Sequence, residues 1–280
     1  MSGKSNLLIR TIAGAVYGAL VICSMLFSRY LFLALILFMT VALMSEYYNM
    51  ALGKGKMKLQ RALAFATAVT FVVTVFCIRS FGIAHSRVSL TMLPLFAMMF
   101  SSLSKTCRAD FANTSHLFTA LVWFALPMGL SSILVLKGGD FNGVMLLCFL
   151  VIDWMSDIGA YAFGMLLGQK PGSKKLAPEI SPKKSWVGFW GGVVMAIATA
   201  WALNALGYLE MPLVFALLLG AIMSVAGVAG DLYESMWKRS HSLKDSGNII
   251  PGHGGMMDRL DSVLFAIPAG SIFLALFNLL

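Results

Sequence analysis

Long runs of apolar residues are the feature that most restricts the fold of this 280-residue chain. A helix needs about 20 apolar residues to cross a bilayer, because backbone polar groups inside the hydrocarbon must be satisfied within the protein. Such runs occur at residues 7–27, 31–50, 62–78, 88–103, 117–136, 142–168, 187–207, 212–232 and 260–280. They predict an all-α, polytopic integral membrane helix bundle of about nine transmembrane helices. The fourth run is short and contains Pro94, so eight spans remain an alternative.

The overall composition agrees with membrane insertion, since 59% of the residues are hydrophobic and only 12% are charged. No repeat, low-complexity segment or soluble appendage interrupts the apolar runs. We therefore expect a single integral membrane domain over residues 1–280, with N-terminal helices in 1–140 and the chemistry in the half 141–280. The four cysteines show no CxxC spacing, which argues against a zinc site or a disulfide framework.

Basic residues predict how the bundle is oriented, because Lys and Arg accumulate in short cytoplasmic loops. With nine spans and a cytoplasmic N-terminus, four of the 21 Lys and Arg fall on the other side: Arg29, Arg79, Arg87 and Lys137. The net charge of +9 would then face the cytoplasm, where it attracts anionic lipid headgroups and nucleotides. No module that interleaves aromatic and basic residues is present, so we expect no nucleic-acid partner.

The segment 231–261 is a polar island between two apolar runs. Charged groups near a bilayer are costly and mark functional sites by default. Within the island, the three- and four-residue spacing of Asp231, Glu234, Ser235 and Lys238 places them on one helix face. The alternative is a solvated loop beside the membrane.

The second half of the island combines a turn with two acids. Gly252, Gly254 and Gly255 disfavour regular helix, and Asp258 and Asp261 follow at the start of the last apolar run. A Gly-rich turn that enters a helix exposes N–H groups suited to phosphate, and carboxylates beside it are suited to Mg²⁺. The segment therefore predicts a metal–nucleotide site.

Three further acids lie in or beside apolar runs. Asp153 and Asp157 are four apart, so both should point into the bundle, either towards water or a cation or as an internal contact that fixes packing. Glu46 precedes Tyr47 and Tyr48 at the end of the second run. We favour an interfacial anchor rich in Tyr. The alternative is a carboxylate that reaches the same side of the membrane as the polar island.

The residues of the island also match a family signature. The segment resembles the pattern S-x-x-K-R-x4-K-D, a short gap, and P-G-H-G-G-x-x-D-R-x-D of the phosphatidate cytidylyltransferase family, also called CDP-diacylglycerol synthases. The matching residues are Ser235, Lys238, Arg239, Lys244, Asp245, Pro251, His253, Gly254, Gly255, Asp258, Arg259 and Asp261.

A second, looser motif of the same family is similar to residues 154–188. The matches are Trp154, Asp157, Gly159, Ala160, Tyr161, Gly164, Lys175, Leu176, Ala177, Pro178, Ser181, Pro182, Lys184, Ser185, Trp186 and Gly188. Ile158 stands where the family has a hydroxyl residue, and Val187 where it has Glu or Gln. Neither departure touches an acid.

The resemblance implies an enzyme that transfers CMP from CTP to phosphatidic acid, giving CDP-diacylglycerol and pyrophosphate in phospholipid biosynthesis. It implies Mg²⁺ as cofactor, with a second cation as an option, and Asp231 and Asp258 as the metal ligands. The other expected catalytic residues are Lys238, Arg239, Lys244, Asp245, His253, Arg259 and Asp261. The expected substrate-binding residues are Asp157, Ser181, Lys184, Ser185, Ser235, Gly254 and Gly255.

Within this set, the cationic side chains would neutralise phosphates, and His253 would hold phosphate or shape the turn. The resemblance also implies a bacterial plasma membrane with the site facing the cytoplasm, membrane lipids as partners and a homodimer as one option. Two other function classes remain open. A small secondary transporter is disfavoured because the acids lie in one half without a repeat, and a CTP-dependent polyprenol kinase would use similar chemistry on another acceptor. A P-loop ATPase is not supported, since no GxxxxGK[ST] is present.

Overall fold

The structure is a computed structural model that describes residues 3–103, 111–170, 172–247 and 254–280. The chain forms two compact units. Unit 1 comprises Met1–Asn142 and Asp245–Arg259, and unit 2 comprises Gly143–Lys244 and Leu260–Leu280. The first boundary lies next to the expected division after residue 140, and the segment 245–259 groups with the N-terminal helices. The single domain over 1–280 stays a prediction.

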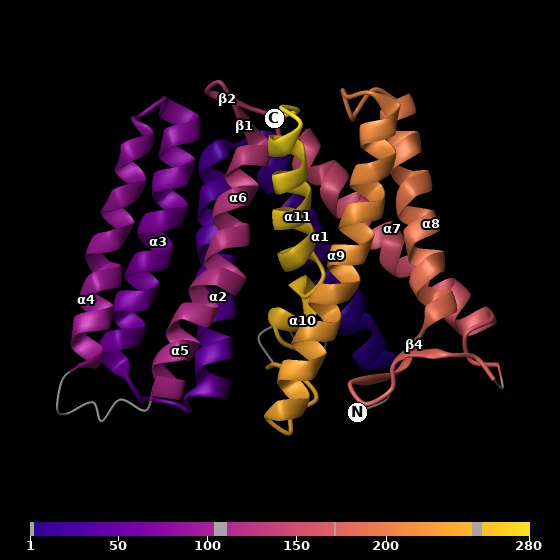
Figure 1. The fold of residues 1–280 in the computed structure, drawn as a ribbon, viewed down its shortest axis with the longest axis horizontal. Helices are drawn as coiled ribbons and strands as arrows, with labels where there is room; N and C mark the ends of the chain where they lie inside the picture. Colours follow the sequence, from indigo (N-terminus) through magenta and orange to yellow (C-terminus); the bar gives the residue numbers. More distant parts are fainter. Residues whose placement is uncertain (1–2, 104–110, 171, 248–253) are drawn as a thin grey trace. The chain divides into compact units, whose positions relative to one another are not determined.

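Unit 1 is almost entirely helical (Figure 1). Its elements are α1 (Gly3–Phe27), α2 (Arg29–Ala51), α3 (Lys58–Phe81), the 3-10 helix η1 (His85–Thr91), α4 (Met92–Ser102), α5 (Phe111–Ala120), the π-helical turn η2 (Leu121–Ala125), α6 (Leu126–Val135), β1 (Leu136–Lys137) and β2 (Asp140–Phe141). Ser28 caps α2 by accepting a hydrogen bond from Leu31 N. β1 and β2 form an antiparallel hairpin whose turn consists of Gly138 and Gly139, both at positive φ as such two-residue turns require.

The helix from Phe111 to Val135 is continuous but contains a π-helical turn at its middle. Pro127 lies two residues after this turn, as the second residue of α6, and has no N–H with which to continue the i to i−4 ladder. Leu126 N donates to Leu121 O, five residues earlier, and local π adjustments of this kind satisfy backbone groups beside a proline in membrane helices. The span therefore continues past its proline.

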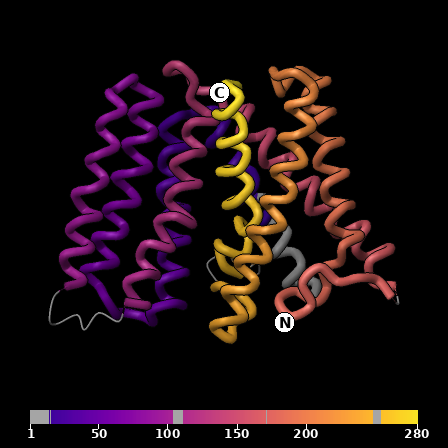
Figure 2. Tube along the Cα trace, viewed as in Figure 1, coloured from indigo at the N-terminus to yellow at the C-terminus, as the bar shows by residue number. Residues whose placement is uncertain are grey.

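Unit 2 contains four long helices that pack as neighbours, α7 (Val144–Leu166), α8 (Trp186–Ala205), α9 (Leu213–Ser240) and α11 (Val263–Leu276) (Figures 1 and 2). An antiparallel hairpin of β3 (Lys175–Ala177) and β4 (Ser181–Ser185) joins α7 to α8, with Ala177 opposite Ser181. The short α10 (Met257–Leu260) precedes α11. α7 and α8 can approach closely because Gly188 has no side chain. A Cβ at this position would lie only 2.9 Å from Ala160 O.

The described residues contain seven helices long and apolar enough to span a membrane. They are Arg29–Ala51, Lys58–Phe81, Phe111–Val135, Val144–Leu166, Trp186–Ala205, Leu213–Ser240 and Met257–Leu276. The all-α, polytopic membrane fold is therefore confirmed, while the count of nine is not. α4 has 11 residues, or about 16 Å of helix against a hydrocarbon core of about 30 Å. Of α1, the stretch Val16–Phe27 is a shorter apolar helix.

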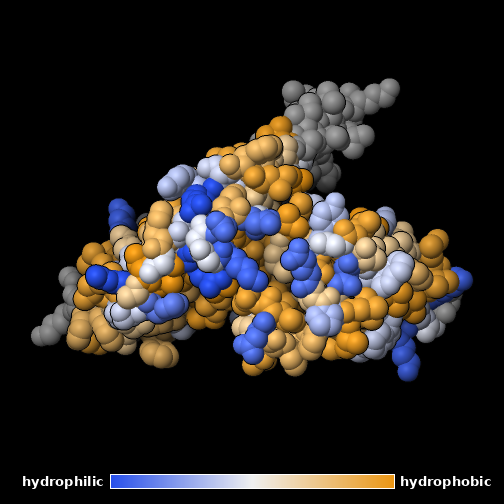
Figure 3. All heavy atoms as spheres, turned by 90° about the horizontal axis from the view of Figure 1, so that it is seen from above, coloured by the Kyte–Doolittle hydropathy of each residue, from blue (hydrophilic) through white to orange (hydrophobic). Residues whose placement is uncertain are grey.

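Large apolar side chains are exposed along these helices, as a lipid-facing surface requires. Phe111 is 84% exposed, and Leu276 is 73% exposed. Figure 3 shows many hydrophobic residues on the visible face and hydrophilic residues in separate groups among them.

Candidate active site

Acidic residues from three parts of unit 2 lie close together. Asp157 is on α7, Asp231 is on α9, and Asp261 lies between α10 and α11. Asp157 is within electrostatic reach of Asp231, and Asp261 is within reach of both Asp231 and Asp157. Like charges repel at such range, and a cation that lies among them offsets the repulsion. We call Asp157, Asp231 and Asp261 the acid cluster.

Lys184 supplies positive charge to the acid cluster. It lies on β4, and its Nζ is 2.5 Å from Asp231 Oδ2. The hairpin β3–β4 places this lysine beside α9, which is distant in the sequence. The basic loop and the acidic helix that resemble the two family motifs thus meet in one site.

The predicted helix face on α9 is confirmed. Ser235 Oγ donates to Asp231 Oδ1 at 3.3 Å, and Lys238 Nζ lies 2.7 Å from Glu234 Oε2. Both contacts join residues four apart, the spacing that brings helical side chains together. α9 continues to Ser240, eight residues beyond the expected end at 232, so the whole face is helical.

A buried polar layer lies beside the acid cluster. Asp153 is 3% exposed, and its Oδ2 accepts from Ser262 Oγ at 2.8 Å. Ser156 and Ser224 hydroxyls are 2.7 Å apart on α7 and α9. Asp153 therefore points into the bundle as predicted, in the form of an internal contact. Asp157, by contrast, is exposed.

Gly230 allows α9 to approach the start of α11. A Cβ at this position would collide with Asp261 O and lie 3.0 Å from the Phe265 ring. We expect Gly230→Ala to destabilise the protein by about 1–3 kcal/mol, because the backbone must move to make room. The measurement is the thermal melting temperature in detergent.

Gly18→Ala is the matched control for this substitution, since a Cβ at Gly18 would meet nothing within 4 Å. Equal melting temperatures for the two variants would contradict the close approach.

In unit 1, Asp258 binds residues on both sides of the loop that contains the Gly-rich part of the signature. Its Oδ2 accepts three hydrogen bonds, from Ser246 N at 2.9 Å, Ser246 Oγ at 2.9 Å and Gly255 N at 3.0 Å. The two sides of the loop are thereby joined through one carboxylate oxygen. Gly254 has φ +85°, a conformation for which glycine is suited.

Glu46 is not an interfacial anchor, and that interpretation was wrong. It is 6% exposed, and its two carboxylate oxygens accept from Met256 N at 2.9 Å and Met257 N at 3.0 Å. A lone acid beside two tyrosines carries no sequence signal for a partner 210 residues away. Only the tertiary structure reveals this contact.

These bonds also correct the expectation about backbone N–H groups. The N–H groups of Gly255, Met256 and Met257 donate to Asp258 and Glu46, so they are not exposed for phosphate. The cause is that the chain supplies its own carboxylates to this turn. The side-chain cations then remain as the expected phosphate ligands.

Several other residues that we expected in the site contact residues close to them in the sequence. Ser185 is buried and caps α8 by accepting from Gly188 N, and Arg239 Nη1 donates to Leu243 O beyond the end of α9. Lys238 is 8% exposed in its pair with Glu234. Ser181 begins β4, and Lys244, Asp245 and Arg259 are exposed. Pro251, Gly252 and His253 lie outside the described residues. The substrate roles of all these residues stay predictions.

The residues fit a hard divalent cation by donor chemistry, because the acid cluster offers several carboxylate oxygens and already attracts an ammonium group. In the parts of the chain that the structure describes, no three His, Cys, Asp or Glu side chains are arranged as ligands of one ion. Asp231 belongs to unit 2 and Asp258 to unit 1. Their joint role as ligands therefore stays a proposal.

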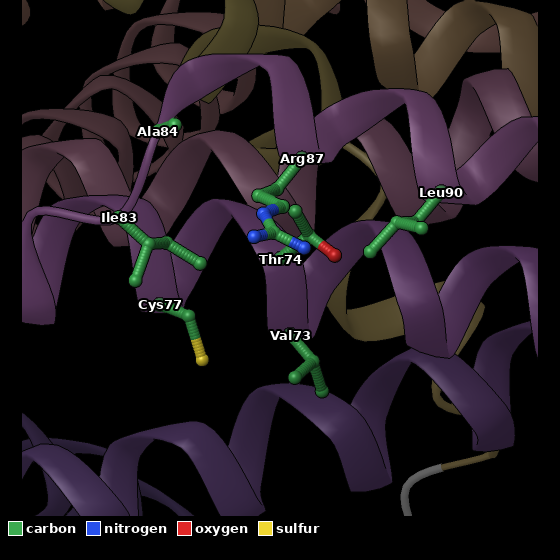
Figure 4. A pocket seen from close by; sticks show the side chains of 7 residues that line it. All are labelled: Val73, Thr74, Cys77, Ile83, Ala84, Arg87 and Leu90. Atoms are coloured by element: carbon green, nitrogen blue, oxygen red, sulfur yellow. The ribbon is translucent and has the colours of Figure 1, made fainter.

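A cavity of about 420 Å³ lies in unit 1 between α3 and η1 (Figure 4). Val73, Thr74, Cys77, Ile83, Ala84, Arg87 and Leu90 line it. It contains none of the signature residues and no acid, so it is unrelated to the acid cluster.

The fold is that of a multi-pass membrane protein in which carboxylates carried by the helices α7 and α9 lie together, with an ammonium group from the β3–β4 hairpin beside them. The chain belongs to the cytidylyltransferase family, whose profile matches residues 8–277.

Curated relatives support this assignment. A protein named phosphatidate cytidylyltransferase from Bacillus subtilis is 47% identical over 128 residues, 46% of each chain. One of the same name from Pseudomonas aeruginosa is 39% identical over 154 residues, 52% of this chain and 55% of its own. A third, from Rickettsia bellii, is 32% identical over 165 residues, 57% of this chain and 70% of its own. The chain thus spans about half the length of the first relatives it matches.

Proposed function

We propose that this protein is a phosphatidate cytidylyltransferase that transfers CMP from CTP to phosphatidic acid. Membership of the cytidylyltransferase family and the names of the relatives support this reaction. The observation that carries the proposal is the contact of Lys184 with Asp231, a member of the acid cluster. It joins the two motifs that resemble the family and sets opposite charges where phosphates would bind.

In the reaction, a phosphate oxygen of phosphatidic acid forms a bond to the α-phosphorus of CTP. The bond between the α-phosphorus and the oxygen that bridges it to the β-phosphorus breaks, and pyrophosphate leaves. The nucleophile is already anionic near pH 7, so no general base is needed. The protein must position two anionic substrates and offset their repulsion.

We assign phosphate neutralisation to the cationic side chains and metal binding to the acidic side chains. Lys184 on β4, with the exposed Lys244 after α9 and the exposed Arg259 on α10, would neutralise phosphates. Asp231 and Asp258 would hold Mg²⁺, with the rest of the acid cluster beside Asp231 and a second cation as an option. Bound Mg²⁺ would supply charge neutralisation at the phosphates. Lys238 and Arg239 would act after leaving their present contacts.

The direct test incubates the purified protein with labelled CTP, Mg²⁺ and phosphatidic acid. Labelled CDP-diacylglycerol and an equal amount of pyrophosphate are expected. Omission of phosphatidic acid is the control for CTP hydrolysis. A phosphorylated polyprenol formed in place of CDP-diacylglycerol would identify a lipid kinase instead.

We further propose that the site faces the cytoplasm of a bacterial plasma membrane, on the distribution of Lys and Arg. Lys174 lies exposed just before β3, on the loop that carries Lys184. A Lys174→Cys variant, with the four native cysteines replaced by Ser, should react with impermeant maleimide only after the cytoplasmic face is opened. Labelling in intact cells would reverse the orientation.

Arg87→Cys in the same background is the matched control, because Arg87 is expected on the other side and is exposed. It should be labelled in intact cells. A homodimer is a separate expectation that native mass spectrometry of the purified protein would test.

A further inference from the structure

Glu46 lies near the end of α2 and binds the beginning of α10 through both carboxylate oxygens. Oε1 accepts from Met256 N, and Oε2 accepts from Met257 N. Met256 is 3% exposed and Met257 is fully buried. Two N–H groups that would otherwise be desolvated at a helix N-terminus are thus satisfied by one distant side chain.

Asp258, the residue after Met257, accepts a hydrogen bond from the same stretch of backbone. Asp258 takes the N–H of Gly255, and Glu46 takes those of Met256 and Met257. Two carboxylates therefore divide three successive amides between them. The main chain on both sides of Gly255 is held, and with it the position from which Asp258 projects.

Glycines make room for the Glu46 carboxylate. A Cβ at Gly247 would lie 2.7 Å from Glu46 Oε1, and one at Gly255 would lie 2.8 Å from Glu46 Oε2. Contacts that short do not occur between a real Cβ and an oxygen. The glycines on both sides of the loop therefore fit against Glu46.

The part of α2 that carries Glu46 is held firmly by its neighbours. The next two residues, Tyr47 and Tyr48, are buried, and their hydroxyls bind His116 Nδ1 at 2.7 Å and Leu117 O at 3.2 Å. Arg61 also donates to Tyr48 O at 2.9 Å. α2 is fixed against α5 and α3 at the residues next to Glu46, so the carboxylate is presented from a firm support.

We propose that Glu46 is a positioning residue that holds the Gly254–Asp258 loop, and so orients Asp258 for the proposed cytidylyl transfer. Its two oxygens face backbone amides, which separates it from groups that touch substrate. Charged acceptors form stronger bonds to amides than neutral ones, so a carboxylate suits this role better than an amide. The inference rests on the proposed function for its kinetic part, whereas the hydrogen-bonded contact stands without it.

Three variants test the role of Glu46. Glu46→Ala removes both acceptors, and Glu46→Gln retains one and places an NH₂ group against the other amide. For Glu46→Ala we expect kcat to fall about tenfold or more, with KM for CTP and for phosphatidic acid changed less than about threefold. The kcat of the Glu46→Gln variant should lie between those of the Glu46→Ala variant and the unsubstituted protein.

The third variant, Gln60→Ala, is the matched control. Gln60 is 5% exposed in unit 1 and donates to Ser101 O at 3.0 Å, so its loss removes a buried bond from side chain to backbone away from the loop. It should lower the melting temperature without the fall in kcat. A general loss of stability would affect both Ala variants alike.

Amide hydrogen exchange, followed by mass spectrometry on the peptide that covers residues 255–258, gives a second measurement without any substrate. Exchange in this peptide should be about tenfold faster or more in Glu46→Ala, and unchanged in Gln60→Ala. Unchanged exchange in Glu46→Ala would overturn the contact. Faster exchange with an unchanged kcat would overturn the positioning role.

The two measurements also separate the inference from the proposed function. If the unsubstituted protein forms no CDP-diacylglycerol, the proposed function and the kinetic role of Glu46 both fail. The exchange measurement then still decides whether Glu46 holds the loop.

Discussion

Asp231→Asn and Asp258→Asn should each reduce kcat by on the order of 10²–10³-fold or more, with the protein still folded in detergent. Asp231 pairs with Lys184 in the acid cluster, and the substitution removes a full negative charge from the place where a cation is expected. Asn has nearly the same shape and can still accept from Ser235 Oγ. Its main effect is therefore on charge.

At Asp258 the same substitution separates two roles. The carbonyl oxygen of Asn can replace Oδ2 as the acceptor for Ser246 N and Gly255 N, so the loop can stay in place. Only the negative charge is then lost. An inactive Asp258→Asn protein with normal amide exchange at residues 255–258 would indicate that the charge itself is needed.

Initial rates of pyrophosphate release and melting temperatures are the measurements for both variants. Glu210→Gln is the matched control, because Glu210 is exposed in the connection between α8 and α9, apart from the acid cluster. Near-normal activity in either Asp variant would remove that residue from the proposed metal ligands.

Gly255→Val is the second substitution with a large expected effect, and it should lower kcat by about a hundredfold or more. A Cβ at Gly255 would collide with Ser246 Oγ and lie 2.8 Å from both Glu46 Oε2 and Gly247 N. The backbone nitrogen cannot move aside as a flexible side chain could. The loop must shift, and Asp258 moves with it, where a displacement of about 1 Å can cost about 10²-fold.

Gly18→Val controls for the introduction of a β-branched side chain, since the space around Gly18 is open. Activity and amide exchange of the 255–258 peptide should be compared in both variants. Normal exchange together with normal activity in Gly255→Val would show that the loop tolerates the bulk and would contradict the crowding argument.

Several features of this protein were determined by the sequence alone, because they depend on neighbours along the chain. The apolar runs predicted the membrane-spanning helices, since helix length against bilayer thickness is a local property. The spacing of Asp231, Ser235, Glu234 and Lys238 predicted contacts that follow from helical periodicity. The motif residues predicted the family that the profile match shows.

Other features were decided only by the tertiary structure, because they depend on which distant groups meet. The fourth apolar run was short and left eight or nine spans open, and the structure shows that its α-helix begins only at Met92, after a 3-10 helix. Ser185, whose substrate role stays a prediction, caps α8. The amides after Gly254 looked open to phosphate, yet Glu46 and Asp258 occupy them. A sequence pattern shows that N–H groups lack helical partners, but a carboxylate 210 residues away satisfies them only when packing brings it there.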